Sequence, residues 1–233
     1  GSFHFVFRQH DGGTKRVLGR TGAFSGEDIL KIVLEQSQLA IHLTEKLWRE
    51  FISETPDPHE VERIAAVFRR SGYRIAPWLQ ALLMSPHFWT QENRGVLTKS
   101  PVDLAVGTIR TFNLPMKDTT ILARYGRRLG QDLFDPPNVK GWPGGTRWIT
   151  TTTLLARWQW LQRSLRGHEL GGHLHPDIQA MGQRGGSTWT TTEPVEVLQS
   201  VLLPIPPVNS MAVGDDRWKI VQQLVLDPAY QLK

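Results

Sequence analysis

Apolar residues recur three or four positions apart along most of the chain, which predicts a mainly α-helical fold. Proline and glycine interrupt these runs at short intervals, so we expect an irregular multi-helix bundle with short connecting loops. The predicted helices cover residues 25–34, 37–52, 58–71, 77–83, 101–112, 119–129, 152–165, 193–203 and 215–226.

Three of these helices have start signals in the sequence. Residues 57–60 and 100–103 each place a capping side chain, a proline and then an acidic residue. Proline fits the first helical position because its missing N–H would have no partner there, and the acid favours the positive end of the helix dipole. Ser25, with Asp28 three residues later, predicts a third start of the capping-box kind.

The N-terminus is the part of the sequence that alternates like a β-strand. The aromatic side chains at positions 3, 5 and 7 have the period of two that predicts a strand. Residues 10–13 form a turn signal, and we expect residues 15–18 to return as the second strand of a small N-terminal β-hairpin. Because a lone two-stranded hairpin is only marginally stable, it should lean on the helices.

Residues 130–150 carry the densest set of conformational constraints in the chain, and we expect a rigid Pro/Gly/Trp loop there. Proline fixes φ and pushes the preceding residue toward extended conformations, while glycine allows a positive φ. Two tryptophans supply apolar surface that can anchor this loop. The residues concerned are Pro136, Pro137, Gly141, Trp142, Pro143, Gly144, Gly145 and Trp148.

We expect three parts along the chain. Residues 1–166 form the main helical domain, which includes the central loop at residues 130–150. Residues 167–192 are rich in glycine and threonine and are expected to form a flexible connector. Residues 193–233 return to helices, which we expect to pack on the same bundle.

Composition narrows the class of protein without identifying it. The net charge is +5 and the pI about 9.7, but the basic residues occur only in short clusters, so nucleic-acid binding is not favoured. The absence of cysteine excludes disulfides and thiolate metal sites. No segment approaches 18 consecutive apolar residues, so we expect no membrane span. Nine tryptophans make the chain tryptophan-rich.

The side chains of the central loop are the main candidates for a binding site. Tryptophan faces beside hydrogen-bonding groups suit a sugar ring or a partner peptide, because they combine apolar area with directional contacts. The alternative is a structural clasp, in which both tryptophans plug into the bundle and a basic side chain pairs with Asp135. The candidate residues are Asp135, Asn138, Lys140, Trp142, Arg147 and Trp148.

An alternative cluster lies in the N-terminal turn. His10, Asp11 and Lys15 combine a carboxylate with two basic groups and could form a small acid–base site. Turns also carry such residues for solubility and local hydrogen bonding, which is the structural alternative.

Three histidines, His168, His173 and His175, are weak candidates for binding a metal. A helical zinc site needs two histidines four positions apart, whereas His168 and His173 are five apart with two glycines between them. We therefore expect no metal. The sequence also lacks a nucleophile elbow, a phosphate-binding glycine loop and a dinucleotide motif, so we expect no cofactor and assign no catalytic residue.

Several motifs resemble a known family. The most specific is FDPPNVKGWPGG at residues 134–145, which resembles the bacterial family catalogued as domain of unknown function 1800. Other matching stretches are residues 17–22, 46–49, 148–149, 153–157 and 227–231. Because family members are longer than this chain, the resemblance implies the C-terminal half of a member.

The resemblance carries implications of its own. Members usually have secretion signals, which implies a periplasmic or extracellular location. They are often encoded beside a secreted sulfatase-like protein, which the resemblance makes a candidate partner. It implies no established activity, cofactor or catalytic residue.

Two functions follow as hypotheses. The first is a non-catalytic binding module of an exported bacterial protein, whose central loop holds a partner protein or a cell-surface glycan. The alternative is a hydrolase-like enzyme whose site is shared with a missing N-terminal half. That alternative requires the N-terminal turn and the central loop to meet in one cleft.

Overall fold

The structure is a computed structural model in which the chain forms two compact units. It describes residues 3–112, 114, 116, 118–166, 194–211 and 217–233. Unit 1 comprises Gly1–Phe51 and Thr55–Phe88, and unit 2 comprises Ile52–Glu54 and Trp89–Lys233. The predicted mainly helical fold is confirmed. The connector predicted at residues 167–192 lies outside the described residues, and the predicted domain boundaries stay predictions.

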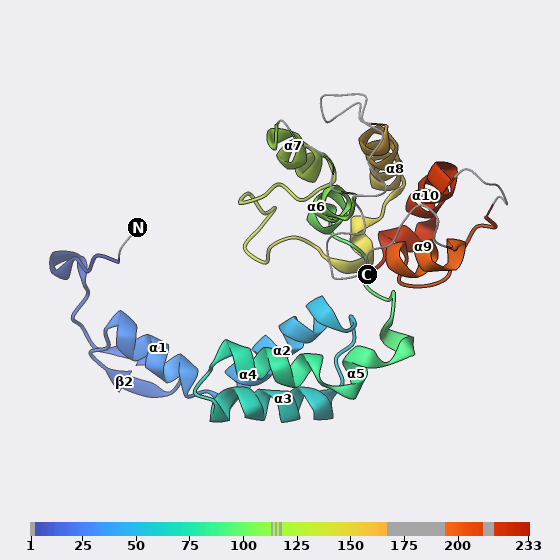
Figure 1. Ribbon diagram of the computed structural model, residues 1–233. Coiled ribbons are helices and arrows are strands. Elements are labelled where there is room, and N and C mark those ends of the chain that lie inside the picture. The colour runs from blue at the N-terminus through green and yellow to red at the C-terminus, as the bar shows by residue number, and fades with distance from the viewer. Residues whose placement is uncertain (1–2, 113, 115, 117, 167–193, 212–216) are drawn as a thin grey trace. The chain divides into compact units, whose positions relative to one another are not determined.

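Unit 1 contains a short hairpin followed by helices, drawn from blue to green in Figure 1. A 3-10 turn, η1 (Phe7–Gln9), precedes strands β1 (Lys15–Val17) and β2 (Arg20–Gly22). The helices are α1 (Gly26–Leu34), α2 (Ser37–Phe51), α3 (Pro58–Arg70), α4 (Ile75–Leu83) and α5 (Pro86–Trp89), the last of which ends one residue beyond the unit.

Helices α2, α3 and α4 pack together around a core of aromatic and aliphatic side chains. The rings of Phe68 and Trp78 stack with centroids 4.1 Å apart and planes 12° apart. The Trp78 Nε1–H donates a 3.0 Å hydrogen bond to Thr44 Oγ1, which itself donates to the Ala40 carbonyl oxygen at 2.7 Å. The buried indole thus has its polar atom satisfied, which specifies how the three helices pack.

The predicted helix starts are confirmed by their hydrogen bonds. Ser25 and Ser100 cap α1 and α6 (Pro101–Thr111), each in a reciprocal capping box with the aspartate three residues later. Asp57 caps α3, with its carboxylate 2.8 Å from the backbone nitrogen of Glu60. Each cap satisfies N–H groups that have no carbonyl partner inside the helix.

The N-terminal hairpin is confirmed, but it forms later in the sequence than predicted. Strand β1 pairs antiparallel with β2, whereas residues 3–7 form no strand. Leu18 and Gly19 connect the two strands with φ of +47° and +83°, as in a two-residue turn whose twist matches the strands. Phe3 and Phe7 are exposed, so no apolar surface stabilises a strand there. The strand predicted at residues 3–7 is therefore wrong.

Unit 2, drawn from green to red in Figure 1, has a core of its own. Besides α6, the helices among its described residues are α7 (Thr120–Arg128), α8 (Thr151–Leu165), α9 (Val195–Leu202) and α10 (Arg217–Leu226). The 3-10 turns are η2 (Gln91–Asn93), η3 (Gly145–Trp148) and η5 (Pro228–Gln231). Helices α6 to α10 share one apolar core, in which the ring of Tyr125 meets that of Trp160 edge-on at 5.6 Å between centroids.

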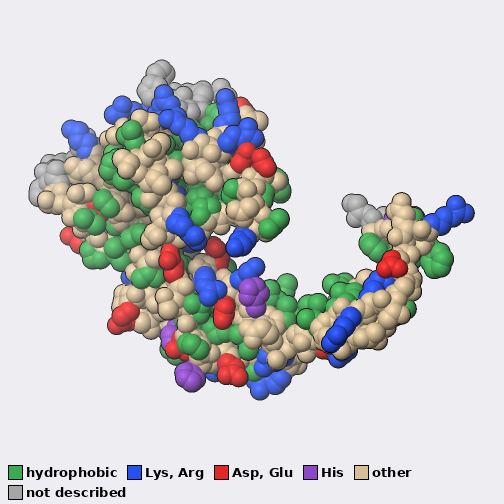
Figure 2. Space-filling model, turned by 180° about the vertical axis from the view of Figure 1, so that it is seen from behind, with side chains coloured by type: hydrophobic (Ala, Val, Ile, Leu, Met, Phe, Trp, Pro, Cys, Tyr) green, Lys and Arg blue, Asp and Glu red, His purple; other side chains and the backbone are tan. Residues whose placement is uncertain are grey.

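Two segments far apart in the sequence close unit 2. Thr98 and Leu232 form an isolated antiparallel bridge, beside which Leu97 and Lys233 exchange backbone hydrogen bonds. Figure 2 shows that hydrophobic side chains also reach the surface of both units, among the charged ones. Across the described residues, no helix combines the length and the apolar character needed to cross a membrane.

Candidate functional site

The central loop is tied down where it leaves α7. The Gln131 N–H donates a 2.7 Å hydrogen bond to the Gly126 carbonyl oxygen and so closes the end of the helix. A Cβ on Gly126 would lie 2.8 Å from the Gln131 carbonyl oxygen, so glycine is what lets the chain turn back this closely. The side-chain Oε1 of Gln131 also accepts the Val102 N–H at 3.0 Å, which joins the loop to the start of α6.

The loop is tied down again where it enters α8. Trp148 is only 6% exposed. Its carbonyl oxygen accepts a 2.9 Å hydrogen bond from Thr153 Oγ1, and Thr153 forms a capping box with Thr150 at the start of α8. The buried indole and the helix cap together hold this second end.

Between these anchors, residues 132–140 form what we call the loop tip. The Lys140 N–H donates a 2.8 Å hydrogen bond to Asn138 Oδ1, a side-chain turn that asparagine favours, and the Gly141 N–H donates to the Asn138 carbonyl oxygen at 3.0 Å. Phe134 has a φ of +67°, a left-handed conformation that is unfavourable for a bulky side chain. The conformation of the tip is therefore set by local hydrogen bonds rather than by burial of its side chains.

The loop tip exposes apolar side chains to solvent. Phe134 is 98% exposed and Val139 104% exposed, and Leu133 is exposed as well. Phe134 and Val139 gain nothing from folding, because their apolar area stays in water. Apolar side chains gathered on one surface mark interaction sites more often than isolated ones do. The candidate residues chosen from the sequence omit all three, because their hydropathy alone is typical of core positions.

The loop tip and the residues that follow it also carry charged groups. Asp135, Lys140 and Arg147 are exposed, and the Arg147 guanidinium donates to a carbonyl oxygen of its own loop. At the base of the loop, Arg127 Nε lies 2.5 Å from Asp132 Oδ2. The pairing of Asp135 with Lys140 or Arg147, which a structural clasp would use, is not formed among the described residues.

The two tryptophans of the loop have different environments. Trp148 is buried and so follows the structural-clasp alternative. Trp142 is half-buried, and its indole nitrogen is enclosed without a hydrogen-bond partner among the described residues. All six candidates lie in one loop, and a binding role stays a prediction for Asp135, Asn138, Lys140, Trp142, Arg147 and Trp148.

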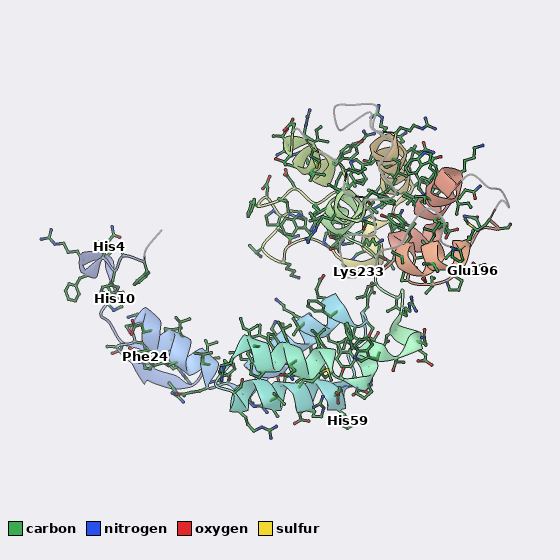
Figure 3. All side chains as sticks on the ribbon, viewed as in Figure 1. His4, His10, Phe24, His59, Glu196 and Lys233 are labelled. Atoms are coloured by element: carbon green, nitrogen blue, oxygen red, sulfur yellow. The ribbon has the colours of Figure 1, made fainter. Side chains whose placement is uncertain are left out.

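The alternative candidates at the N-terminus form a compact turn in unit 1, where Figure 3 labels His10. Lys15 Nζ donates to the carbonyl oxygens of Asp11 and Gly13, and it lies 3.7 Å from Asp11 Oδ2. A hydrogen bond from the Gly13 N–H, with the charge of Lys15, lowers the pKa of the exposed Asp11 carboxyl. The ring of His10 lies 5.3 Å from that of Phe5. Because this turn and the central loop belong to different units, their meeting in one cleft stays a prediction.

The histidines named as metal candidates, His168, His173 and His175, lie outside the described residues. Within the part of the chain that the structure describes, no three His, Asp or Glu side chains gather closely enough to hold a metal ion.

Unit 2 also contains a buried polar cluster that the sequence did not indicate. Arg157, on α8, is fully buried. One terminal nitrogen donates to Gln231 Oε1 at 3.1 Å and the other to the Lys99 carbonyl oxygen at 2.9 Å. Lys99 Nζ donates to the Tyr230 carbonyl oxygen at 2.8 Å and lies 3.8 Å from the centre of the Tyr230 ring. We call Lys99, Arg157, Tyr230 and Gln231 the Arg157 cluster.

Two cationic side chains share the Arg157 cluster, and burial changes their proton affinity. Burial, with the charge of Arg157, lowers the pKa of Lys99 to about 8 against the opposing effect of Asp103. Burial also lowers the pKa of Arg157 to about 10 and raises that of Tyr230 to about 12. The Asp103 carboxylate contacts Lys233 Nζ, labelled in Figure 3, at 2.8 Å. These bonds join α6, α8 and the last residues of unit 2, so the cluster serves to hold the unit closed.

Comparison with known proteins supports the family resemblance. A family model described as "Protein of unknown function (DUF1800)" matches residues 1–232, which is essentially the whole chain. No curated protein and no solved structure matches it. The description of the family names no ligand, partner or reaction.

Proposed function

Because the chain belongs to the DUF1800 family, whose description names no activity, we propose a function from the loop tip. The protein is a non-catalytic binding module that uses the loop tip to hold a partner protein. The observation that carries this proposal is the exposure of the Phe134 ring, at 98%, on a loop fixed at both ends.

The loop tip suits binding because its conformation is set before a partner arrives. Gln131 and Trp148 hold its ends, and the Asn138 side chain shapes the turn between them. A surface that is already ordered loses less conformational entropy on association. The left-handed conformation of Phe134 costs on the order of 1–3 kcal/mol, and glycine at that position would avoid the cost if the ring had no use.

The exposed groups fit a protein surface better than a sugar. Sugar binding suits flat tryptophan faces flanked by polar groups, but Trp148 is buried and Trp142 is half-buried. The exposed Phe134, Leu133 and Val139 of the tip offer aromatic and aliphatic side chains to a partner instead. Such side chains fit an apolar pocket on a partner protein.

The charges beside the tip and the family resemblance narrow the partner. The exposed cations Lys140 and Arg147 outnumber the one exposed carboxylate among the described residues of the loop, Asp135, and so favour a protein with acidic groups around its apolar pocket. We propose that the two proteins meet in the periplasm or outside the cell, as the resemblance implies. The co-encoded secreted sulfatase-like protein is the candidate that the resemblance supplies.

Site-specific photo-crosslinking in the native host tests this function. A photoreactive phenylalanine analogue replaces Phe134 or, as a matched control, Val208, which is exposed on the same unit. We expect a discrete crosslinked protein from position 134 and none from position 208. Adding Val139→Asp to the first variant should abolish the crosslink, because it puts a charge into the apolar contact.

Thermal unfolding shows whether each variant is folded. Phe134 and Val139 are exposed, so their replacement should leave the melting temperature unchanged. If position 134 gives no crosslinked protein, or if Val139→Asp leaves the crosslink as strong as before, the loop tip is not a binding surface.

A further inference from the structure

Two surface clefts of unit 2, both within the described residues, differ in charge. The larger, of about 360 Å³, lies between the segment around η2 and α9 and contains both Arg94 and Glu196, the latter labelled in Figure 3. Because this cleft contains both charges, it does not favour a ligand of either charge. The smaller, of about 230 Å³, we call the arginine cleft. It is lined by Ile121, Arg124, Tyr125, Arg128 and Arg163.

Three arginines from two helices line the arginine cleft. Arg124 and Arg128 lie one turn apart on α7 and so share a face, and Arg163 joins them from α8. Between the helices, Tyr125 is buried with its ring against Trp160. Figure 2 shows Lys and Arg side chains, in blue, crowded at several places on the surface of this unit.

The two arginines of α7 have only weak partners. Arg124 approaches Asp118 to 3.8 Å, and that carboxylate already accepts hydrogen bonds of 2.6 and 2.9 Å from Thr120. Arg128 contacts the neutral Oε1 of Gln159 at 3.5 Å. Positive charges gathered in this way repel one another, so an anion that enters the cleft is favoured.

Arg127, on the same helix, provides the contrast. Its Nε makes a 2.5 Å ion pair with Asp132 Oδ2, and it does not line the cleft. The negative C-terminal end of α7 accounts for basic residues gathering here. The helix dipole does not explain why Arg127, outside the cleft, has a close carboxylate whereas Arg124 and Arg128 do not.

We propose that the arginine cleft binds a tetrahedral oxyanion, namely a phosphate or sulfate group carried as a monoester. Planar guanidinium groups offer paired N–H donors to the oxygens of such anions. The volume of about 230 Å³ is below the range of pockets for drug-sized ligands. It therefore fits the anionic group and the carbons next to it, for which Ile121 and Tyr125 in the lining provide apolar surface.

Isothermal titration calorimetry with phenyl phosphate, phenyl sulfate and uncharged phenyl glucoside tests this site on the intact chain. We expect at least one ester to bind saturably at low salt, with a Kd of about 1 mM or below, and the glucoside not to bind. The ester that binds more tightly identifies the anionic group.

Matched arginine variants test the position of the site. Arg128→Gln should weaken ester binding about tenfold, because it removes a charge-assisted contact. Arg127→Gln removes the same charge from the same helix outside the cleft, and it should change the affinity less than about twofold. The proposal would be overturned if neither ester bound saturably to the folded parent. It would also be overturned if both variants lost the same affinity, because that indicates attraction to the basic surface in general.

Discussion

The loop tip and the Arg157 cluster differ in which side chains they expose: the tip exposes apolar side chains, and the cluster buries charged ones. At the loop tip, Phe134 and Val139 stand in water. In the Arg157 cluster, a guanidinium and an ammonium are withdrawn from it. Both arrangements run against the usual preference for apolar side chains inside and charges outside, so each needs a compensating interaction.

The difference lies in where the compensation is found. Arg157 has its acceptors within the fold, on Gln231 and on the Lys99 backbone, so its burial belongs to the closing of unit 2. The apolar side chains of the loop tip have no comparable cover among the described residues. The comparison teaches that the buried charge has its compensation inside the fold, whereas the exposed apolar surface has none there and would gain free energy only from the partner that we propose.

The largest effect should come from the anchor of the loop. Trp148→Ala removes an indole that is 6% exposed, and truncating a core tryptophan costs about 3–5 kcal/mol. We expect the melting temperature to fall by at least about 6 °C, at ~2–4 °C per kcal/mol for a chain of this size. Differential scanning calorimetry measures the shift, and a decrease of the melting temperature by less than about 2 °C would show that the anchor contributes little.

The Arg157 cluster should make the stability of unit 2 depend on pH. The folded pKa of Lys99, about 8, lies below its ordinary value of 10.5. Between these values the unfolded chain binds more protons, so stability rises as the pH increases from 8 to 10, by up to about 2–3 kcal/mol. Urea unfolding at pH 8, 9 and 10 measures the rise.

A control variant and an upper pH limit complete the design of that experiment. Lys99→Met should remove most of the increase, and a parent and variant with the same slope would contradict a lowered Lys99 pKa. The range stops at pH 10 because the pKa of Tyr230 is raised to about 12. Above pH 10 the unfolded tyrosine ionises first, which lowers the stability of the folded state.

Removing the buried guanidinium should have a smaller effect than removing the indole. Arg157→Met leaves Gln231 Oε1 and the Lys99 carbonyl oxygen without their donor, which costs about 1–3 kcal/mol. Urea unfolding at pH 7 measures the loss. A variant as stable as the parent would mean that apolar packing replaces the cluster, as happens with some buried ionic groups.

The smallest effect on stability should come from the loop tip. Phe134→Ala should change the free energy of unfolding by less than about 0.5 kcal/mol, because the ring is in water. Phe134→Gly, which suits the φ of +67°, should leave stability unchanged or raise it by up to about 1 kcal/mol. Both should abolish partner binding. A loss above about 2 kcal/mol in urea unfolding would show that the ring supports the fold.

Local signals account for what the sequence could predict about the fold. The caps at Ser25, Asp57 and Ser100 act over three residues, so they can be read without knowing the rest of the structure. Of the predicted hairpin, residues 15–18 match β1, whereas the partner strand is predicted wrongly at residues 3–7. The observed turn puts Leu18 in a left-handed conformation, which leucine rarely adopts, so the sequence gives no signal for a turn there.

Contacts between distant residues account for what the sequence could not predict. Trp148 and Phe134 are both large aromatic residues, yet one is buried and the other exposed, because only Trp148 lies where the loop rejoins the helices. The acceptor of Arg157 on Gln231 is 74 positions away. The arginine cleft likewise needs α7 and α8 side by side, so local spacing gave no sign of it.

The pairing of residues 97–99 with residues 231–233 sets an order of events during synthesis. The bond from Lys99 Nζ to the Tyr230 carbonyl oxygen spans 131 positions, so α6 to α8 leave the ribosome long before the segment that closes them exists. Unit 1 contains no residue after Phe88. A ribosome that pauses between these points would have made all of unit 1, while the Gln231 side chain that accepts from Arg157 would not yet exist.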